Sequence, residues 1–351
     1  MPLRLYVDGP RWRRHQEAVR EAHPGLVPVM KGNGYGFGLA RLAGCAQRLG
    51  ADTVAVGSYA EAPVVAERFG GDVLVLSPWR PFEAGLGSGP QVVHTVGRLG
   101  DLEELAARQD RPRVVLERLT SMRRHGFSAR ELREAAGLLD GPGPGRGVEV
   151  EGVALHLPIS RGSHLTEVDR LMTDVVAAGL PTRRVFVSHL DDAELATLRR
   201  AWPEYELRPR IGTSLWLGDR SALSVRATVL DVHAVDRGDV YGYRSRTAPS
   251  AGTILVVSGG TAHGIGLEAP TGGATLKDRA ARIAKGGLDA AGFVRSPYTV
   301  GGKQRLFAEP PHMQASMLFL PAGAAVPAVG DEVDVRVRFT VTSFDETVVS
   351  A

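Results

Sequence analysis

Short apolar runs alternate with helical stretches over the first two-thirds of the chain. Many of the apolar runs are rich in valine, as β-strands are, and the stretches between most of them are typical of helices. This alternation is the pattern of βα units, in which each strand is followed by a helix. The predicted strands lie at 25–31, 52–58, 72–78, 91–97, 111–119, 148–158, 183–190 and 205–218. The predicted helices lie at 39–50, 59–70, 98–109, 128–140, 164–179 and 191–202.

Eight βα units in one stretch of chain predict an α/β fold of the TIM (β/α)8 barrel type. A doubly wound open sheet is the alternative. Its first strand would be followed by the glycine pattern G-x-G-x-x-G at the start of a helix. Here the corresponding stretch KGNGYGFG, residues 31–38, begins with a lysine and spaces its glycines differently. The barrel is therefore favoured.

The pattern changes after about Leu217. Alternating apolar and polar segments follow, separated by glycine and proline turns, as in β-rich domains. We therefore predict a barrel domain over residues 1–217, followed by a mostly β C-terminal domain over residues 218–351. The isolated short strand near the N-terminus, within residues 1–8, is a candidate to pair with that second domain.

Composition excludes several classes of protein. The 351 residues are 43% hydrophobic and 23% charged, as in soluble globular proteins, and no apolar run is long enough to span a membrane. The N-terminal residues contain no apolar signal core, so no export is expected. The single cysteine, Cys45, excludes an internal disulfide and indicates the cytoplasm, and we expect its side chain to be buried.

Charge and residue spacing also indicate which kinds of molecule the protein binds. The net charge is only +3, and the basic residues are interspersed with acidic ones, which argues against a nucleic-acid surface. No cluster of histidine, aspartate and glutamate has the spacing of metal ligands, so no metal is expected. A small molecule is the expected partner.

Lys31 is the residue that points to a chemistry. Only four of the 42 basic residues are lysines, and Lys31 is the only lysine among the first 276 residues. It follows the first strand, and barrel enzymes carry their chemistry at the carboxyl ends of strands. A lysine amine condenses with an aldehyde to form a Schiff base, whereas a guanidinium cannot. The alternative is a surface lysine beside a flexible turn.

The glycine-rich loop after Lys31 adds a second feature. It exposes backbone N–H groups and offers the hydroxyl of Tyr35, and both suit a phosphate group. Pyridoxal 5′-phosphate carries an aldehyde and a phosphate on one ring. The two features together indicate this cofactor.

Eight stretches resemble, in order, the conserved stretches of the alanine racemase family. VMKGNGYGFG, residues 29–38, resembles its signature K-A-N-A-Y-G-H-G, and residues 5–19 resemble its opening strand and helix. The other stretches are LTSMRRHGF at 119–127, EGVALHLP at 151–158, RIGTSLW at 210–216, GDVYGY at 238–243, VGGKQ at 300–304 and HMQASM at 312–317. The resemblance covers nearly the whole chain, and it implies a homodimer whose active sites are shared between subunits.

The resemblance also implies roles for individual residues. Lys31 and Tyr241 match the two catalytic residues, which act on opposite faces of the substrate Cα, with the tyrosine supplied by the partner subunit. Arg124 and Met313 match substrate-binding positions. Arg210 matches the residue that contacts the pyridine nitrogen, although Arg208 is a competing alignment. The positions that match cofactor-binding residues are Lys31, Tyr35, Arg124, His156, His189, Arg210, Gly212 and Thr213.

Four positions depart from the family pattern. Glu117 stands in place of a carbamylated lysine that is often the partner of the arginine at position 124. Phe344 and Ala193 replace two hydroxyl residues that donate to the phosphate, and Gln314 replaces an aspartate. Each lost phosphate donor removes a charge-assisted hydrogen bond of about 1.5–3 kcal/mol.

Three functions remain open on the sequence. The first is a racemase that interconverts L- and D-alanine, and the second is a racemase for another amino acid. The third is a non-catalytic descendant that binds pyridoxal phosphate or a partner protein. The presence of both Lys31 and Tyr241 favours catalysis, because neither residue is needed for binding alone.

Overall fold

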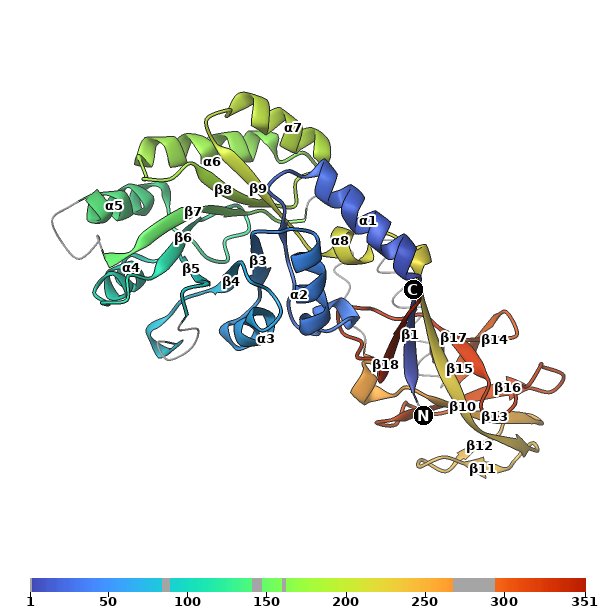
Figure 1. The fold of residues 1–351 in the computed structure, drawn as a ribbon. Coiled ribbons are helices and arrows are strands. Elements are labelled where there is room, and N and C mark those ends of the chain that lie inside the picture. Colours follow the sequence, from blue (N-terminus) through green and yellow to red (C-terminus); the bar gives the residue numbers. More distant parts are fainter. Residues whose placement is uncertain (1, 84–88, 141–146, 160–161, 268–293) are drawn as a thin grey trace. The chain divides into compact units, whose positions relative to one another are not determined.

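The computed structural model describes residues 2–83, 89–140, 147–159, 162–267 and 294–351 (Figure 1). Lys277 and Lys285 lie outside the described residues. The chain divides into two compact units. One unit comprises residues 13–218, and the other comprises residues 1–12 together with residues 219–351.

The first unit is built on a parallel sheet that closes on itself. Its strand order is β2-β9-β8-β7-β6-β5-β4-β3, and every pairing is parallel. A bridge between Val29 and Ala55, with Met30 N–H donating to Ala55 O at 2.8 Å, joins the two ends of this order. The eight strands are β2 (Val27–Pro28), β3 (Thr53–Val56), β4 (Asp72–Pro78), β5 (Val92–Val96), β6 (Arg113–Arg118), β7 (Glu149–His156), β8 (Arg184–Ser188) and β9 (Glu206–Ile211). The predicted TIM barrel is confirmed, and the doubly wound sheet is excluded.

The first barrel strand is shorter than its apolar run suggests. The run extends over residues 25–31, but β2 contains only Val27 and Pro28. Proline has no N–H to donate to a neighbouring strand, so regular pairing is interrupted at this position. The contact with β3 is made by the following residues, Val29 and Met30.

Apolar side chains fill the barrel interior. Because successive side chains of a strand point to opposite faces, every second residue of each strand points inward. Arg208 lies at one edge of this packing, where its guanidinium is 5.5 Å from the centre of the Phe186 ring. The interior cluster consists of Val27, Val29, Ala55, Leu74, Val93, Val115, Ala154 and Phe186, with Leu76 packed against it.

Helices lie outside the barrel strands, as Figure 1 shows. Just before α7, the side chain of Asp191 accepts the N–H of Glu194 at 2.8 Å, and the side chain of Glu194 accepts the N–H of Asp191 at 3.0 Å, which fixes the start of the helix. Cys45, on α2, is 1% exposed, so its expected burial is confirmed. The α-helices are α1 (Gly9–Ala22), α2 (Leu39–Arg48), α3 (Ala62–Ala66), α4 (Leu99–Ala106), α5 (Ala129–Asp140), α6 (Leu165–Ala178), α7 (Asp192–Ala201) and α8 (Thr213–Leu217).

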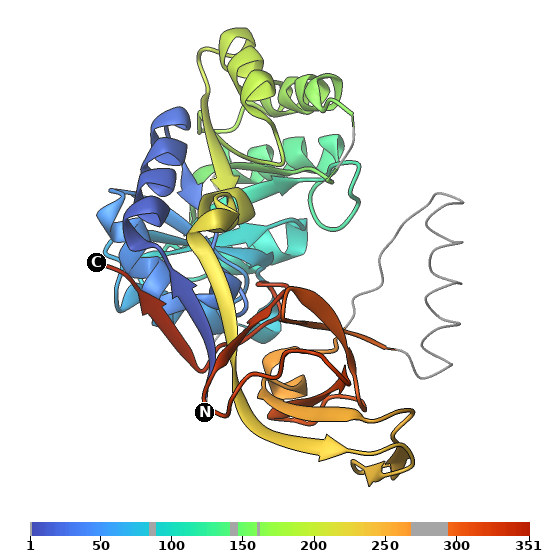
Figure 2. The same cartoon turned by 90° about the vertical axis from the view of Figure 1, so that its right-hand side faces the viewer.

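The second unit is mostly β, as predicted. An eight-stranded sheet has the order β13-β16-β15-β14-β17-β10-β1-β18, and β10 also pairs with β13. Figure 2 shows β10 (Leu223–Val235) as a long curved strand. The N-terminal strand β1 (Leu3–Val7) pairs with β10 and β18. The other strands of the sheet are β13 (Gly252–Ser258), β14 (Arg295–Val300), β15 (Lys303–Phe307), β16 (Ala315–Pro321), β17 (Glu332–Val335) and β18 (Glu346–Val349).

A separate hairpin, β11 (Val240–Tyr241) and β12 (Arg246–Thr247), completes the second unit. Over the described ranges of both units, no helix combines the length and the apolar character that crossing a membrane requires.

Candidate active site

Polar side chains replace apolar ones at the carboxyl ends of four neighbouring strands. On β6, β7 and β8, Val115, Ala154 and Phe186 belong to the apolar interior. Two residues further along each strand, the same inward face carries a polar group, because side chains on one face recur every second residue. These groups, with the corresponding inward residue of β9, are Glu117, His156, Ser188 and Arg210.

A cavity of about 180 Å³ lies at this end of the barrel. It brings together four of the residues that the sequence singled out: Lys31, Arg124, His156 and Arg210. Glu117, the residue in place of a carbamylated lysine, is also part of the wall. The complete lining is Lys31, Gly57, Leu76, Ser77, Glu117, Arg124, His125, His156 and Arg210.

The amine of Lys31 shares this cavity with two arginines. Burial lowers its pKa below the ordinary lysine value, and the positive charges of Arg124 and Arg210 lower it further. Glu61 opposes this shift. A lower pKa increases the fraction of neutral amine, which is the form that attacks a carbonyl carbon.

Arg210 and Glu117 place opposite charges in the buried wall of the cavity. The side chain of Arg210 donates to Leu155 O at 3.3 Å, and burial lowers its pKa to about 10, although Glu117 opposes this. Burial raises the pKa of Glu117, and Arg210 and Arg124 pull it down. The two residues are 7% and 4% exposed. A carboxylate thus lies within the influence of two guanidinium groups.

Arg208, the competing alignment for Arg210, lies away from this cavity. Its guanidinium forms an ion pair with Asp52 and donates to Gly25 O at 3.2 Å. It lines a different cavity, with residues that precede β2 and β3. Of the two arginines, Arg210 is the one that lies beside Lys31.

Two histidines meet beside the cavity. The rings of His156 and His189 are 5.5 Å apart in an edge-to-face arrangement, and Ser188 Oγ hydrogen-bonds His156 Nδ1 at 2.9 Å. Burial lowers the pKa of His156 to about 3, and the charge of Arg210 contributes. His156 is therefore neutral at physiological pH. His189 lies on the wall of a neighbouring cavity of about 500 Å³.

Tyr35 and Gly212 fit against each other at the loop that follows Lys31. Tyr35 is 6% exposed and hydrogen-bonds the side chain of Thr213, at the first residue of α8. A Cβ atom at Gly212 would collide with the Tyr35 hydroxyl. Only glycine therefore allows this approach, which gathers the Tyr35 hydroxyl, the Thr213 hydroxyl and backbone N–H groups at one place.

Sequence reasoning missed Glu61, which connects two loops beside Lys31. Its Oε1 accepts Gly32 N–H at 2.8 Å, and its Oε2 accepts Gly57 N–H at 2.6 Å. A Cβ at Gly57 would lie only 3.0 Å from the Cβ of Lys31. The spacing of Ser58 and Glu61, which is that of a capping box, is the signal that could have identified this glutamate.

Tyr241, Met313 and Phe344 belong to the β-rich unit. The Tyr241 hydroxyl donates to Ala308 O at 3.3 Å, and Met313 is 69% exposed. Phe344 packs against the Phe339 ring, with 5.9 Å between ring centres. Ala193, the other departure at the phosphate position, is in the first turn of α7 in the barrel unit.

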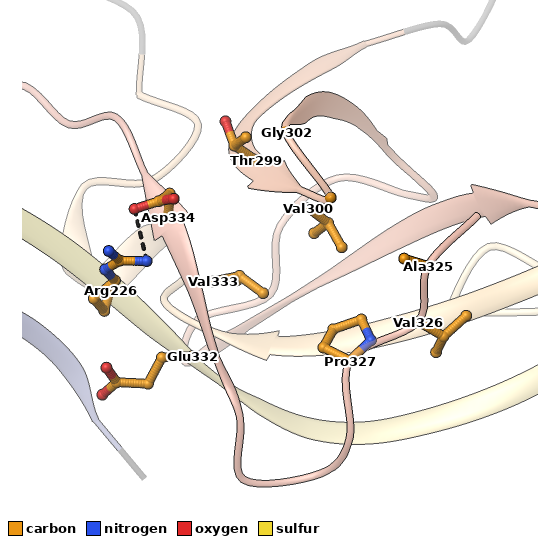
Figure 3. Close-up of a pocket in the computed structure, with 11 residues that line it drawn as sticks. Arg226, Thr299, Val300, Gly302, Ala325, Val326, Pro327, Glu332, Val333 and Asp334 are labelled. Atoms are coloured by element: carbon orange, nitrogen blue, oxygen red, sulfur yellow. Dashed lines mark ion pairs between the residues drawn. The ribbon is translucent and has the colours of Figure 1, made fainter.

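The β-rich unit has a cavity of its own, of about 260 Å³ (Figure 3). Its wall is formed in part by Val300, Val326 and Val333, and the ion pair of Arg226 and Asp334 spans 2.9 Å at its side. The described residues that line this cavity include no lysine, histidine, cysteine or tyrosine. It therefore offers no amine, imidazole, thiol or phenol, whereas the barrel cavity contains an amine, an imidazole and a buried carboxylate, so the barrel cavity is the candidate active site.

Comparison with known proteins agrees with this assignment. Residues 9–218 match the family model described as alanine racemase, N-terminal domain. The matched range contains every residue that lines the barrel cavity. An alanine racemase from Nitratidesulfovibrio vulgaris (strain Miyazaki F) is 27% identical over 290 residues, which are 71% of this chain and 72% of that protein.

Solved structures share the fold over the full length. The alanine racemase from Bartonella henselae, crystallised with covalently bound pyridoxal phosphate, superposes with a TM-score of 0.73 at 16% identity and covers 100% of both chains. The alanine racemase from Bacillus anthracis with bound L-Ala-P has a TM-score of 0.71 at 20% identity, covering 99% of this chain and 87% of that one. At such identities the likeness establishes the fold.

Proposed function

Since this chain belongs to the alanine racemase family, we propose that it is a pyridoxal 5′-phosphate-dependent racemase that interconverts L- and D-alanine. The observation that carries the proposal is the cavity in which Lys31, Arg124, His156 and Arg210 meet. These residues come from separate strands and loops, and the amine of Lys31 has a lowered pKa. A racemase of this type needs an amine that is partly neutral, at the carboxyl end of the barrel strands.

The donors present fit the cofactor. Lys31 would hold it covalently, and Arg210 would donate to its pyridine nitrogen. Arg124 would donate to its phenolic oxygen. Tyr35, Thr213 and the N–H groups that follow Gly212 would bind the phosphate, without the donors that Phe344 and Ala193 have replaced. His156 and His189 would face the ring.

The cofactor, when bound, withdraws electrons from the substrate Cα and weakens its C–H bond. With the cofactor loaded, the substrate amine would take the place of the Lys31 amine on it. The freed, neutral amine of Lys31 would then accept the Cα proton from one face, and the Tyr241 hydroxyl would donate a proton to the other face, which would invert the centre. The reverse transfers convert the product back. Arg124 orients the substrate carboxylate, and Met313 borders the substrate. Arg210 would place a positive charge at the pyridine nitrogen, which would disfavour protonation of that nitrogen and so discourage side reactions.

Tyr241 belongs to the β-rich unit, and we propose that it serves the barrel of a second copy of the chain. The active enzyme is then a homodimer with two composite sites. The single cysteine favours a reducing compartment, and we place the enzyme in the cytoplasm.

A racemisation assay tests the function. Purified protein loaded with pyridoxal phosphate is incubated with L-alanine, and D-alanine is measured by chiral chromatography. We expect D-alanine from the wild type and none from Lys31→Arg, which keeps the charge but loses the nucleophilic amine. The control is Lys303→Arg, because Lys303 lies on β15 of the β-rich unit.

Two results would contradict parts of the proposal. If the loaded wild type inverts another amino acid with a higher kcat/KM than alanine, the proposed substrate is wrong, although the proposed reaction, racemisation, is right. If no amino acid is inverted although borohydride fixes the cofactor to Lys31, the protein is not a racemase.

A further inference from the structure

Tyr241 lies on a hairpin that is too small to be stable by itself. The strands β11 and β12 contain two residues each, and Tyr241 pairs with Arg246 across them. An isolated two-stranded hairpin is marginal in water. Both side chains of this pair donate to one acceptor, Ala308 O, at 3.3 Å each. The position of the phenol therefore depends on the backbone at residue 308.

The next residue, Glu309, places a buried carboxylate against the same hairpin. It is 2% exposed, and its Oε1 accepts Tyr243 N–H at 3.3 Å. Gly242, at φ +71°, lies so close that a Cβ there would collide with this carboxylate. The turn that follows Tyr241 thus closes directly onto Glu309, and only glycine fits between them.

His312 binds the same oxygen of Glu309 that accepts Tyr243 N–H. Its Nε2–H donates to Glu309 Oε1 at 2.6 Å, and its ring meets the Tyr243 ring at 4.9 Å between centres. A buried carboxylate is costly unless it is hydrogen-bonded, so the imidazole stabilises Glu309 in one orientation. Glu309, His312 and the turn after Tyr241 form one connected unit.

We propose that Glu309 and His312 are positioning residues for Tyr241. They fix the hairpin, so that the phenol keeps one orientation and stays near the charges of Arg246 and Glu309. The catalytic meaning of this proposal rests on the proposed function. Burial raises the pKa of Tyr241 above its ordinary value; the charge of Arg246 opposes this, and that of Glu309 adds to it. Tyr243, Arg244 and His312 are the other titratable groups of the hairpin and of the segment packed against it.

The direct test measures the ionisation of Tyr241 in the full-length protein loaded with pyridoxal phosphate. Tyrosine labelled with ¹³C at Cζ is titrated by NMR, and the Tyr241 signal is identified by its loss in Tyr241→Phe. Glu309→Gln keeps the shape and an acceptor oxygen but removes the charge. We expect the Tyr241 pKa to fall in this variant, because a negative neighbour that resists ionisation is gone.

Tyr6 and Glu332 provide a matched control within the same unit. The Tyr6 hydroxyl donates to Glu332 Oε1 at 2.8 Å, and this bond is the largest cause of the raised pKa of Tyr6. Glu332→Gln should lower the Tyr6 pKa and leave Tyr241 unchanged. If Glu309→Gln leaves the Tyr241 titration unchanged while Glu332→Gln shifts Tyr6, the proposal is wrong.

Kinetics provide a second, separate readout. We expect His312→Leu to lower kcat by about tenfold with little change in KM, because a misplaced acid–base group affects the reaction more than binding. His312→Gln keeps an N–H donor and should retain most of the activity. Equal activity in wild type and His312→Leu would overturn the proposal. A wild type without racemase activity would instead refute the proposed function, and the titration would still decide whether Glu309 acts on Tyr241.

Discussion

Arg208 and Arg210 both lie on the inward face of β9, but their side chains contact different groups. Arg208 forms an ion pair with Asp52 and lies over the Phe186 ring at 5.5 Å. Arg210 lines the cavity that contains Lys31. The Arg208 guanidinium therefore connects segments at one end of the barrel interior. The Arg210 guanidinium provides a positive charge at the opposite end, where Lys31 lies.

This separation predicts opposite effects of the same substitution. Arg208→Gln should reduce the free energy of unfolding by about 1–3 kcal/mol, because it removes a charge-assisted hydrogen bond, and should leave racemisation unchanged. Arg210→Gln should reduce kcat/KM by about a hundredfold and leave stability the same or higher, because burying a cation is costly. Urea denaturation and the chiral assay measure the two effects. An exchange of the two phenotypes would show that the roles of the arginines are reversed.

Glu61 should affect catalysis although it lies outside the cavity lining. Glu61→Gln weakens the bonds to Gly32 and Gly57 N–H, which hold the loops on both sides of Lys31. We expect kcat to fall by about tenfold, the kinetic equivalent of one weakened charge-assisted bond. Glu131→Gln is the control, since Glu131 accepts Ser128 N–H in the same manner at the start of α5. Similar activity in both variants would contradict the role of Glu61.

Glu117 should make the stability of the protein depend on pH. Burial raises its pKa in the folded state, so between the unfolded and folded pKa values the native state binds more protons. Stability then falls as the pH rises through this interval. Glu117→Gln should therefore be more stable than the wild type at about pH 8, with a smaller difference at about pH 4. Urea denaturation at both pH values checks this.

The matched control for Glu117 is Glu134→Gln, which changes an exposed residue of α5. A Glu117→Gln variant that is less stable than the wild type at the higher pH would refute the assignment. The same variant should lose activity, because Arg124 loses an anionic neighbour.

Gly212 should be intolerant of a side chain. Gly212→Ala forces the Tyr35 hydroxyl away from Thr213, so the dissociation constant of pyridoxal phosphate should increase by about tenfold or more. Equilibrium dialysis with absorbance detection measures it. Gly137→Ala, where a Cβ would meet nothing within 4 Å, is the control. Unchanged cofactor affinity in Gly212→Ala would exclude Tyr35 and Thr213 as phosphate donors.

Composite sites predict complementation between two inactive variants. In a mixture of Lys31→Ala and Tyr241→Phe, about half of the randomly paired dimers contain one site with both residues intact. Activity should recover to roughly a quarter of the wild-type value if sites act independently. Subunit exchange is followed with two different affinity tags. Demonstrated exchange without recovery would exclude a site shared between subunits.

The sequence by itself determined the barrel and the position of its chemistry. Alternation in parallel strands fixes which residues face inward, so Glu117 and His156 follow from Val115 and Ala154, and Arg210 follows from Arg208, each by a spacing of two. The solitary Lys31 after the first strand indicated where the reactive end lies. These features are local, because they depend on neighbours within a few residues.

Only the tertiary structure decided the contacts between distant segments. Glu61 binds Gly32 across 29 positions, and Glu309 binds Tyr243 across 66. Neither pair has a local pattern that requires it, since each contact arises from how loops of separate elements meet. The choice of Arg210 over Arg208 has the same origin. Both point inward, and only the closed barrel determines which of them lies beside Lys31.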